Sequence, residues 1–497
     1  MASPLPTGEP LSPQTHRRLA AELRAVLSRG GLLESVEERR PYECDGLSAY
    51  RQLPLMVAMP QTEQQVIDIL KVCHEHRVPV VARGAGTSLS GGALPLANGV
   101  LLSLARLSKI VSVDPKNRVA HVQPGVRNLA ISEAAAPHGL YYAPDPSSQI
   151  ACSIGGNVAE NAGGVHCLKY GLTVHNVIGL RFVTIEGEVV EVGGATLDGP
   201  GYDLLALLTG SEGMLGVVVE ITVKLLPKPE HAQVVLAAFD TVAQASEAVT
   251  AIIASGFIPA GLEMMDQMST RATEEYAHAG YPTDAGALLL CELDGTRAEV
   301  DHGIERIRQL MQKQGAIELR VSTNEIERKQ LWAGRKAAFP AIGRLAPDYY
   351  CMDGTIPRKH LAKVLAEINR LSAEYKLPVA NVFHAGDGNL HPLILYDAAK
   401  PGDLERTEEL GAEILKLCID VGGTITGEHG VGVEKVDQMC MQFKPEELAQ
   451  FHAVKAAFDP HALLNPGKAV PTLARCAEFG RMHVHRGQEK FPDLPRF

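Results

Sequence analysis

The chain has 497 residues, of which 47 are Lys or Arg and 58 are Asp or Glu, so its formal charge is −11. At about 100–200 residues per domain, this length indicates two to four domains. Its 45% apolar and 21% charged residues are typical of a folded enzyme. The acidic balance argues against nucleic-acid binding, which needs a concentrated basic face.

The apolar runs are all shorter than the roughly 18 residues that a membrane-spanning helix needs. The first ten residues lack the basic and apolar regions of a secretory signal. The nine cysteines are odd in number and form no Cys-x-x-Cys pair, which argues against a disulfide framework and against common iron–sulfur ligand sets. We therefore expect a cytoplasmic protein.

Hydrophobic periodicity predicts a helix over 15–31 and another that begins at Thr62. Short apolar runs predict strands over 78–82, 100–104, 119–122, 177–184, 189–192 and 217–226. The Pro-Lys-Pro sequence at 227–229 is the predicted domain boundary, because long helices then alternate with strands. Those strands are expected over 234–239 and 287–293, and the helices over 241–255, 296–313, 325–340, 358–375, 403–419 and 445–457. This mixture predicts α+β modules.

Three glycine clusters lie beside predicted strands, at 83–92, 144–171 and 209–216. The first contains four glycines and three hydroxyl residues, so its backbone amides are open to an anion. It is not a dinucleotide fingerprint, whose third glycine would fall at Leu89, and no Lys-Ser/Thr pair follows it. A single cluster of this kind is more often a surface loop. Three together predict one extended ligand lying across a sheet.

A second group of motifs predicts a metal site. A two-residue type I′ turn at Asp387-Gly388 would place His384 directly opposite His391, with Cβ atoms about 4.5–5.5 Å apart. Glu428 and His429 lie in a segment rich in Gly and Thr. Two imidazoles and one carboxylate are the set that open catalytic sites use for zinc or similar divalent metals.

The segments 80–92, 144–171 and 210–217 resemble the FAD domain of the vanillyl-alcohol oxidase/p-cresol methylhydroxylase (PCMH) superfamily. The resemblance implies an α+β fold with a two-part PCMH-type FAD-binding domain, an α+β cap domain with an antiparallel sheet, and a C-terminal helical segment that returns to the FAD domain. The corresponding domains are expected at 1–50 (helical), 51–230 (FAD), 231–434 (cap, substrate and metal) and 435–497 (C-terminal helices).

The same resemblance implies which residues bind the cofactor, with 83–92 on the diphosphate. The implied residues are Arg83, Gly84, Ala85, Gly86, Thr87, Ser88, Gly91, Gly92, Pro144, Ser147, Ser153, Gly156, Asn157, Gly163, Glu212, Gly213 and Val217. Some members attach the flavin to a histidine in or near the first loop. Because 83–92 contains neither His nor Cys, we expect non-covalent FAD, with His166 and Cys167 as the alternative attachment points.

The spacing His384-x6-His391 with Glu428-His429 resembles the metal-dependent D-2-hydroxy-acid dehydrogenase branch, which includes D-lactate and D-2-hydroxyglutarate dehydrogenases. This resemblance implies that His384, His391 and Glu428 bind a divalent metal, zinc or manganese, and that His429 is the catalytic base. The matching Leu-Trp-Ala-Gly-Arg segment implies that Arg335 binds substrate. Without the resemblance, Arg335 would be interpreted as a solvent-exposed residue on the surface of a helix.

Where the hydroxyglutarate enzymes carry further polar ligands, this chain has Phe339, Cys351 and Leu393, which favours a small monocarboxylate. From about residue 15 to 497, including 348–357 and the tail from His483, the chain is most similar to the flavoprotein subunits of bacterial glycolate oxidases. That similarity implies oxidation of glycolate or D-lactate to glyoxylate or pyruvate, with hydride passing to FAD and not to NAD. It also implies a second FAD-type subunit, an iron–sulfur subunit, and peripheral attachment to the cytoplasmic face of the inner membrane through these partners.

Three other interpretations of the function remain open at this point. The chain could be a stand-alone D-lactate (D-2-hydroxy-acid) dehydrogenase that uses a soluble acceptor. It could be a non-catalytic flavin-binding subunit of an electron-transfer complex, although the complete His/His/Glu/His set argues against this. A metal hydrolase without flavin would use the metal motifs alone.

Overall fold

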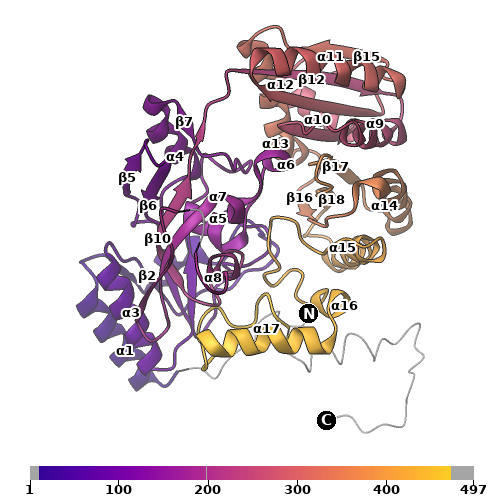
Figure 1. Ribbon diagram of the computed structural model, residues 1–497. Coiled ribbons are helices and arrows are strands. Elements are labelled where there is room, and N and C mark those ends of the chain that lie inside the picture. The colour runs from indigo at the N-terminus through magenta and orange to yellow at the C-terminus, as the bar shows by residue number, and fades with distance from the viewer. Residues whose placement is uncertain (1–10, 197–198, 472–497) are drawn as a thin grey trace.

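The computed structural model describes residues 11–196 and 199–471 (Figure 1). The N-terminal part contains two larger sheets, one two-stranded sheet and their helices, and the following part contains one seven-stranded sheet with helices on both faces. A last helix returns to the N-terminal part. The tail motif from His483 lies outside the described residues.

The helices of the N-terminal part are α1 (Pro13–Val26), α2 (Val36–Arg39), η1 (Arg40–Tyr42), α3 (Glu63–Glu75), α4 (Asn128–Ala135), η2 (Ala136–His138), α5 (Ile154–Glu160), α6 (Cys167–Tyr170), α7 (Thr173–Asn176) and α8 (Leu204–Leu208). Its strands are β1 (Leu32–Leu33), β2 (Met56–Ala58), β3 (Val80–Arg83), β4 (Val100–Ser103), β5 (Ile110–Asp114), β6 (Val119–Val122), β7 (Leu140–Tyr141), β8 (Val177–Val183), β9 (Val189–Gly193), β10 (Val217–Lys224) and β11 (Leu226–Pro227).

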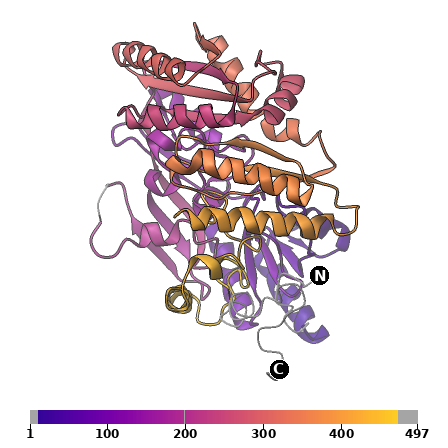
Figure 2. The ribbon, with the colours of Figure 1, turned by 90° about the vertical axis from the view of Figure 1, so that its right-hand side faces the viewer.

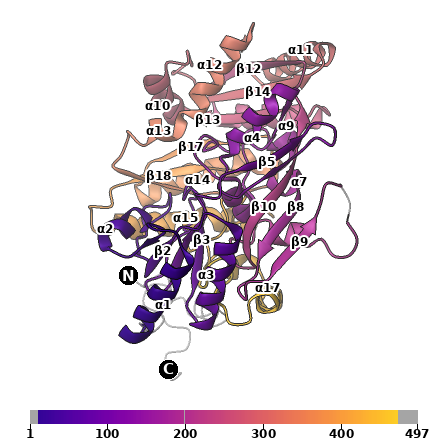
Figure 3. The same cartoon turned by 90° about the vertical axis from the view of Figure 1, so that its left-hand side faces the viewer.

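The two larger sheets of this part differ in strand direction. In the order β1-β2-β4-β3, strands β2, β4 and β3 are parallel, and α1 and α3 pack together beside them (Figure 3). Leu19 and Leu23 of α1 and Val66 and Leu70 of α3 are fully buried in this core, which the helical spacing of these residues predicts. The second sheet is antiparallel, in the order β5-β6-β10-β8-β9, and β11 pairs separately with β7.

The remaining strands are β12 (His231–Phe239), β13 (Gly261–Asp266), β14 (Ala287–Gly295), β15 (Glu318–Val321), β16 (Asp348–Cys351), β17 (Val379–Phe383) and β18 (Pro392–Tyr396). The remaining helices are α9 (Val242–Ala254), α10 (Gln267–Ala277), α11 (Arg297–Lys313), α12 (Glu325–Lys336), α13 (Ala338–Ile342), η3 (Arg358–His360), α14 (Leu361–Tyr375), α15 (Asp403–Asp420), α16 (Met439–Gln442) and α17 (Pro445–Phe458).

The seven-stranded sheet runs β15-β12-β14-β13-β17-β18-β16 and is antiparallel throughout. Alternate residues of β12 pack into different cores. Val235, Ala237 and Phe239 belong to the core that contains residues of α9, α11, α14 and α15. Val234 and Leu236 belong to the core on the other face, which contains residues of α10, α12 and α13. Figure 2 looks onto the first of these helical layers. Burial on both faces explains why these strands are continuous apolar runs.

The helix predicted over 325–340 is divided at Ala337 into α12 and α13. Pro340 supplies the reason, because a proline ring clashes with the carbonyl group four residues earlier, here that of Lys336. The break lets Pro340 lie in the first turn of a new helix. As a result, Lys336 and Phe339 lie on either side of the break.

After α16, the helix α17 returns to the N-terminal part, where Val454 and Phe458 pack against the core of the antiparallel sheet (Figure 1). Together with the mixed helices and antiparallel sheets, this return confirms the predicted α+β class. Among the described residues, none of the helices is long and apolar enough to cross a bilayer.

Candidate active site

One cavity of about 380 Å³ lies between the glycine segments and the hairpin of β17 and β18. At one end it is lined by Lys336, Phe339, His391, Glu428 and His429. All but two of the residues predicted to bind the cofactor line the rest, namely Arg83, Gly84, Ala85, Gly86, Thr87, Ser88, Gly92, Ser147, Ser153, Gly156, Asn157, Gly163, Glu212, Gly213 and Val217. The fold therefore brings both groups of motifs to a single cavity.

The first glycine segment follows β3, at the carboxyl end of a parallel strand, where ligands of such sheets bind. It approaches the second segment so closely that a Cβ atom on Gly84 would lie 2.0 Å from Ser153 Oγ. Gly86 has a φ of 73°, a left-handed conformation that favours glycine. A backbone this open gives a diphosphate access to amide groups, so the segment fits FAD.

The two predicted cofactor residues that are absent from the described lining have other contacts. A Cβ atom on Gly91, whose φ is 74°, would lie 2.5 Å from Val433 Cγ2, so this glycine lets the first segment pack against the segment after His429. The carbonyl of Pro144 accepts a hydrogen bond from Asn128 Nδ2 at 3.1 Å. Both residues support the walls of the cavity.

Two buried carboxylates lie beside the glycine segments. Glu212 accepts hydrogen bonds of 2.7 Å from the backbone N–H groups of Val431 and Gly432, which ties the third glycine segment to the segment after His429. Glu160, which the sequence analysis missed, lines the cavity and accepts a bond from Ser88 Oγ. Burial and the nearby Glu212 raise the pKa of Glu160 well above its usual value. Its Oε2 has no hydrogen-bond partner in the described part of the chain. This atom is therefore available for a hydrogen bond with a ligand in the cavity.

The predicted register of the histidine hairpin is wrong by two residues. Asn381 pairs with Pro392 and His384 forms a bridge with Asn389, so His384 and His391 are diagonal neighbours on the same face. Tertiary hydrogen bonds from residues 385–388 to β13 and to residue 356 hold a four-residue turn instead of the two-residue one. The diagonal arrangement still brings the two imidazole ring centres within 5.1 Å.

The three predicted metal ligands converge as expected for a chelating site. Nε2 of His384 and Nε2 of His391 each lie 3.2 Å from Glu428 Oε1. His391 Nε2 is buried, and among the described residues it makes no well-aligned hydrogen bond although two carboxylate oxygens, of Glu428 and Asp353, lie 3.2 and 3.4 Å away. Burial would raise the pKa of Glu428, but His384 and His391 hold it well below its usual value. An anion between two imidazoles fits a divalent cation such as zinc or manganese.

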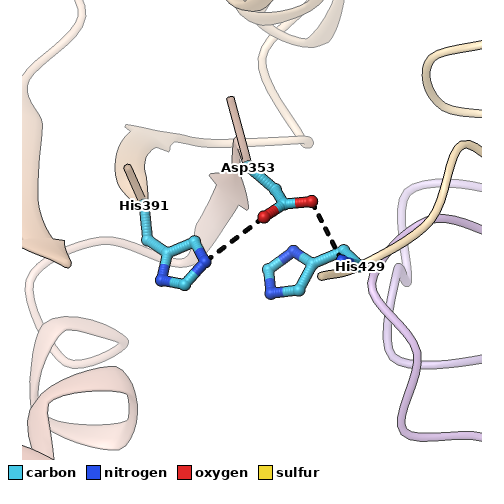
Figure 4. Close-up of side chains that lie close together, drawn as sticks. All are labelled: Asp353, His391 and His429. Carbon is cyan, nitrogen blue, oxygen red and sulfur yellow. Dashed lines mark hydrogen bonds and ion pairs between the residues drawn. The ribbon is translucent and has the colours of Figure 1, made fainter. Parts of the chain in front are cut away.

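Asp353 organises the segment that carries Glu428 and His429, and the sequence analysis did not single it out. Its Oδ2 accepts hydrogen bonds from Thr426 Oγ1 (2.6 Å) and from the backbone N–H groups of Gly427 (3.0 Å) and His429 (2.9 Å). Figure 4 shows Asp353 joined on one side to the ring of His391 and on the other to the backbone nitrogen of His429. One carboxylate therefore sets the path of the whole segment.

The same carboxylate also holds the hairpin, because Oδ1 accepts a 2.8 Å bond from Asn389 Nδ2 and lies 3.4 Å from His391 Nε2. Burial alone would raise the pKa of Asp353, but the charge of Lys435 and the contact with His391 keep it well below its usual value. Asp353, His391 and His429 could geometrically form a second metal group. Because donors of the protein already occupy Asp353, we interpret it as an anchor and not as a ligand.

His429, the predicted catalytic base, lines the cavity beside His391. Its ring stacks on that of His391, with centres 4.8 Å apart and planes 3° from parallel. Burial lowers the pKa of His429 to about 4, so the imidazole is neutral at physiological pH. Its Nδ1 is buried and lacks a partner within the described residues. A neutral, cavity-lining imidazole can accept a proton.

Arg335 lies outside the described lining of the cavity and is 1% exposed. Its Nε and Nη2 contact Glu263 Oε2 at 2.9 and 2.6 Å. Glu263 Oε1 in turn lies 2.8 Å from His384 Nδ1, so one carboxylate joins the predicted substrate arginine to a predicted metal ligand. The signal in the sequence that could have found Glu263 is an acidic residue with Leu262 and Met264 as its apolar neighbours in β13. Direct contact of Arg335 with substrate stays a prediction.

Neither His166 nor Cys167 belongs to the described lining. The His166 ring lies 2.9 Å from Asp145 Oδ2 and 3.3 Å from Glu292 Oε1. Burial would lower the pKa of His166, but these two carboxylates raise it to about 10. The imidazolium therefore links the segment around α6 to β14 of the large sheet, which is a structural role.

The three residues predicted to shape a small substrate pocket do not all lie at the cavity. Phe339 lines the cavity, with its ring centre 6.4 Å from that of His391. Cys351 and Leu393 face each other in the β16–β18 ladder and are buried in the core under α12 and α13. Only Phe339 of these three bounds the described cavity.

Comparison with known proteins agrees with this arrangement. A family model described as "FAD binding domain" matches residues 54–193, and one described as "FAD linked oxidases, C-terminal domain" matches 228–469. The chain is 64% identical over 466 residues to glycolate oxidase subunit GlcD of Escherichia coli (strain K12), covering 94% of this chain and 93% of that protein. It is 33% identical over 425 residues to a D-lactate dehydrogenase of Anaerostipes hadrus, covering 84% and 89%.

The crystal structure of p-cresol methylhydroxylase with substrate bound has the same fold, with a TM-score of 0.79 at 18% identity over 93% of this chain and 98% of that chain. This similarity confirms the predicted PCMH-type architecture of a FAD-binding part and a cap. The relatives and both family matches, which together include most of the residues that line the cavity, show that the chain belongs to the FAD-linked oxidases.

Proposed function

We propose that this protein oxidises a small 2-hydroxy acid, glycolate or D-lactate, to the corresponding 2-oxo acid, glyoxylate or pyruvate. Membership among the FAD-dependent 2-hydroxy-acid oxidoreductases follows from its relatives, which are named for glycolate and for D-lactate. The observation that carries the proposal is the shared cavity, in which the glycine segments continue into His391, Glu428 and His429. A flavin and a hydroxy acid would then meet in one enclosed space.

Bound in this cavity, FAD would accept a hydride from C2 of the substrate, and a divalent metal would polarise the C2 hydroxyl. The residues that would hold the metal are His384, His391 and Glu428. Non-covalent binding of FAD is supported by the position of His166 and Cys167 outside the described cavity lining. Gly163 supports contact between the two subsites, because a Cβ atom there would lie 2.3 Å from Glu428 Oε2.

His429 would take the proton of the substrate hydroxyl as the C2–H electron pair leaves and the C=O bond forms. Its low pKa keeps the ring unprotonated before each turnover. Lys336 lines this end of the cavity, and its positive charge favours an anionic substrate. Phe339 restricts the size of the substrate at the same end. Arg335, which is paired with Glu263, would reach a substrate carboxylate only as a further contact.

The word "subunit" in the name of the Escherichia coli relative supports a complex with other proteins. We propose that electrons pass to a second FAD-type subunit and an iron–sulfur subunit, and then to membrane quinone, with this chain held peripherally at the cytoplasmic face of the inner membrane. The alternative is a stand-alone D-lactate dehydrogenase with a soluble acceptor, as the name of the Anaerostipes relative suggests.

The test is anaerobic mixing of the purified protein with glycolate, D-lactate, L-lactate or D-2-hydroxyglutarate, while absorbance is followed near ~450 nm, where oxidised flavin absorbs. Bleaching by glycolate or D-lactate, lost after treatment with EDTA and restored by zinc or manganese, is the expected result. Bleaching by D-lactate but not glycolate would favour the stand-alone alternative. A yellow, metal-loaded protein that none of the four acids bleaches would refute the proposal.

A further inference from the structure

The segment that follows α17 passes directly beneath the glycine segments. The backbone N–H of Val80 donates to Leu463 O at 2.7 Å, and that of Asn465 donates to Val80 O at 2.8 Å. Leu464 thereby forms a parallel bridge with β3, the strand that leads into the first glycine segment. The end of the described chain is thus attached to the start of the cofactor cavity.

The side-chain amide of Asn465 joins two glycine segments. Its Nδ2 donates to the carbonyl oxygen of Gly92 at 2.9 Å and to that of Glu212 at 2.7 Å. Gly92 closes the first segment and Glu212 lies in the third, and both line the cavity. Because Asn465 is only 2% exposed, water cannot readily replace these bonds.

Lys468 completes the arrangement from the same turn. Its Nζ donates to Asn465 Oδ1 at 2.6 Å, to Gly92 O at 3.1 Å and to Leu94 O, and the residue is fully buried. An ammonium group has three donors, and here each has an acceptor. The bond to Oδ1 also fixes the orientation of the Asn465 amide, so that its NH2 faces the two glycine segments.

The backbone of this turn is strained. Ala462, Asn465 and Ala469 have φ values of 49°, 45° and 56°, in the left-handed region that residues with a Cβ atom seldom occupy. Such conformations persist where the surroundings over-determine them, and they cluster at functional sites. The contacts of Asn465 and Lys468 are the bonds that hold this turn against the cavity wall.

We propose that Asn465 and Lys468 are positioning residues of the flavin site, which hold the first and third glycine segments at the separation that FAD binding requires. Neither residue lines the described cavity, so both act through the backbone carbonyls of Gly92, Leu94 and Glu212. The inference depends on FAD binding, which the family establishes, and not on the substrate proposed above.

Two variants test the inference in the holoenzyme. Asn465→Asp removes both amide donors, keeps the size of the side chain and the acceptor for Lys468, and tolerates a left-handed φ. Lys468→Met keeps a long stem and removes all three donors. Release of FAD after dilution is followed by the fluorescence of free flavin, and the melting temperature of the protein is measured in parallel.

Asp266→Asn is the control. The Asp266 carboxylate is buried at the end of β13 and accepts hydrogen bonds from Ser269 N (2.8 Å) and Asn381 N (2.7 Å), and none of these three residues belongs to the described cavity lining or to a glycine segment. This variant should lower the melting temperature with little change in FAD affinity.

We expect each test variant to bind FAD about tenfold more weakly or worse, by the usual contribution of a buried hydrogen bond. The inference is overturned if Asn465→Asp retains FAD as the parent does. It is also overturned if the control loses FAD in proportion to its fall in melting temperature, as the test variants do. If Lys468→Met does not fold, Asn465→Asp alone decides.

Discussion

Replacing Glu263 by Gln is expected to weaken the binding of a divalent metal at His384, His391 and Glu428. In the structure, one oxygen of Glu263 faces His384 Nδ1 at 2.8 Å and the other faces Arg335 Nη2 at 2.6 Å. The carboxylate therefore accepts a hydrogen bond from His384 through one oxygen and from Arg335 through the other. It also keeps the proton of the His384 ring on Nδ1, which leaves Nε2 free to bind a metal.

A Gln side chain cannot satisfy both neighbours. If its carbonyl faces His384, its NH2 group meets the donors of Arg335. If it is flipped, its NH2 faces Nδ1 and favours the tautomer with the proton on Nε2, which cannot bind metal. Loss of such an outer partner typically costs about 10–100-fold in metal affinity, equivalent to about 1.4–2.7 kcal/mol.

The assay is metal affinity, measured by competition with a chelator of known affinity and checked by metal content. Glu292→Gln is the matched control, because Glu292 lies opposite Gly261 on the next strand, is 2% exposed and accepts a bond from Arg328, but contacts none of the proposed metal ligands. Both variants should be destabilised, since Glu263→Gln leaves the buried Arg335 without its carboxylate and Glu292→Gln removes the buried charge that pairs with Arg328 and His166. Equal metal affinity in the two variants would refute the reasoning.

Three further outcomes are expected. His429→Gln should slow flavin reduction by the substrate about 10²–10⁴-fold in stopped-flow experiments, since it removes the proposed base, and a loss under threefold would exclude that role. Gly84→Ala should reduce FAD occupancy, read as the ratio of flavin to protein absorbance, because its Cβ would lie 2.0 Å from Ser153 Oγ; full occupancy would contradict the close approach. The pKa of His166 is raised to about 10, so its stabilising charge is complete below about pH 6.5, the ordinary value, and is lost as the pH rises toward 10. The free energy of urea unfolding that His166→Asn removes should therefore shrink over that interval, and a pH-independent difference would be contrary evidence.

Several features of the fold and site follow from the sequence because they are local. The open backbone at Gly84 and Gly86 is a property of glycine itself, so the cofactor segments were recognisable before their positions in space were known. The apolar runs of β12 and β14 predict buried strands, and the spacing of α1 and α3 predicts their packing faces. Resemblance to a family supplied the superfamily fold, and the comparison with p-cresol methylhydroxylase confirms it.

Other features depend on partners that are distant in the chain, and only the tertiary structure decided them. The turn after His384 is set by bonds from β13 and residue 356, which override the preference of Asp-Gly for a two-residue turn. Asp353 and Glu263 had no recognised motif, because their roles arise from donors on other elements. Asn465 and Lys468 likewise gain their significance from carbonyl groups hundreds of residues earlier. Periodicity and backbone preference act between near neighbours, whereas a buried polar group is satisfied by whatever the folded chain brings beside it.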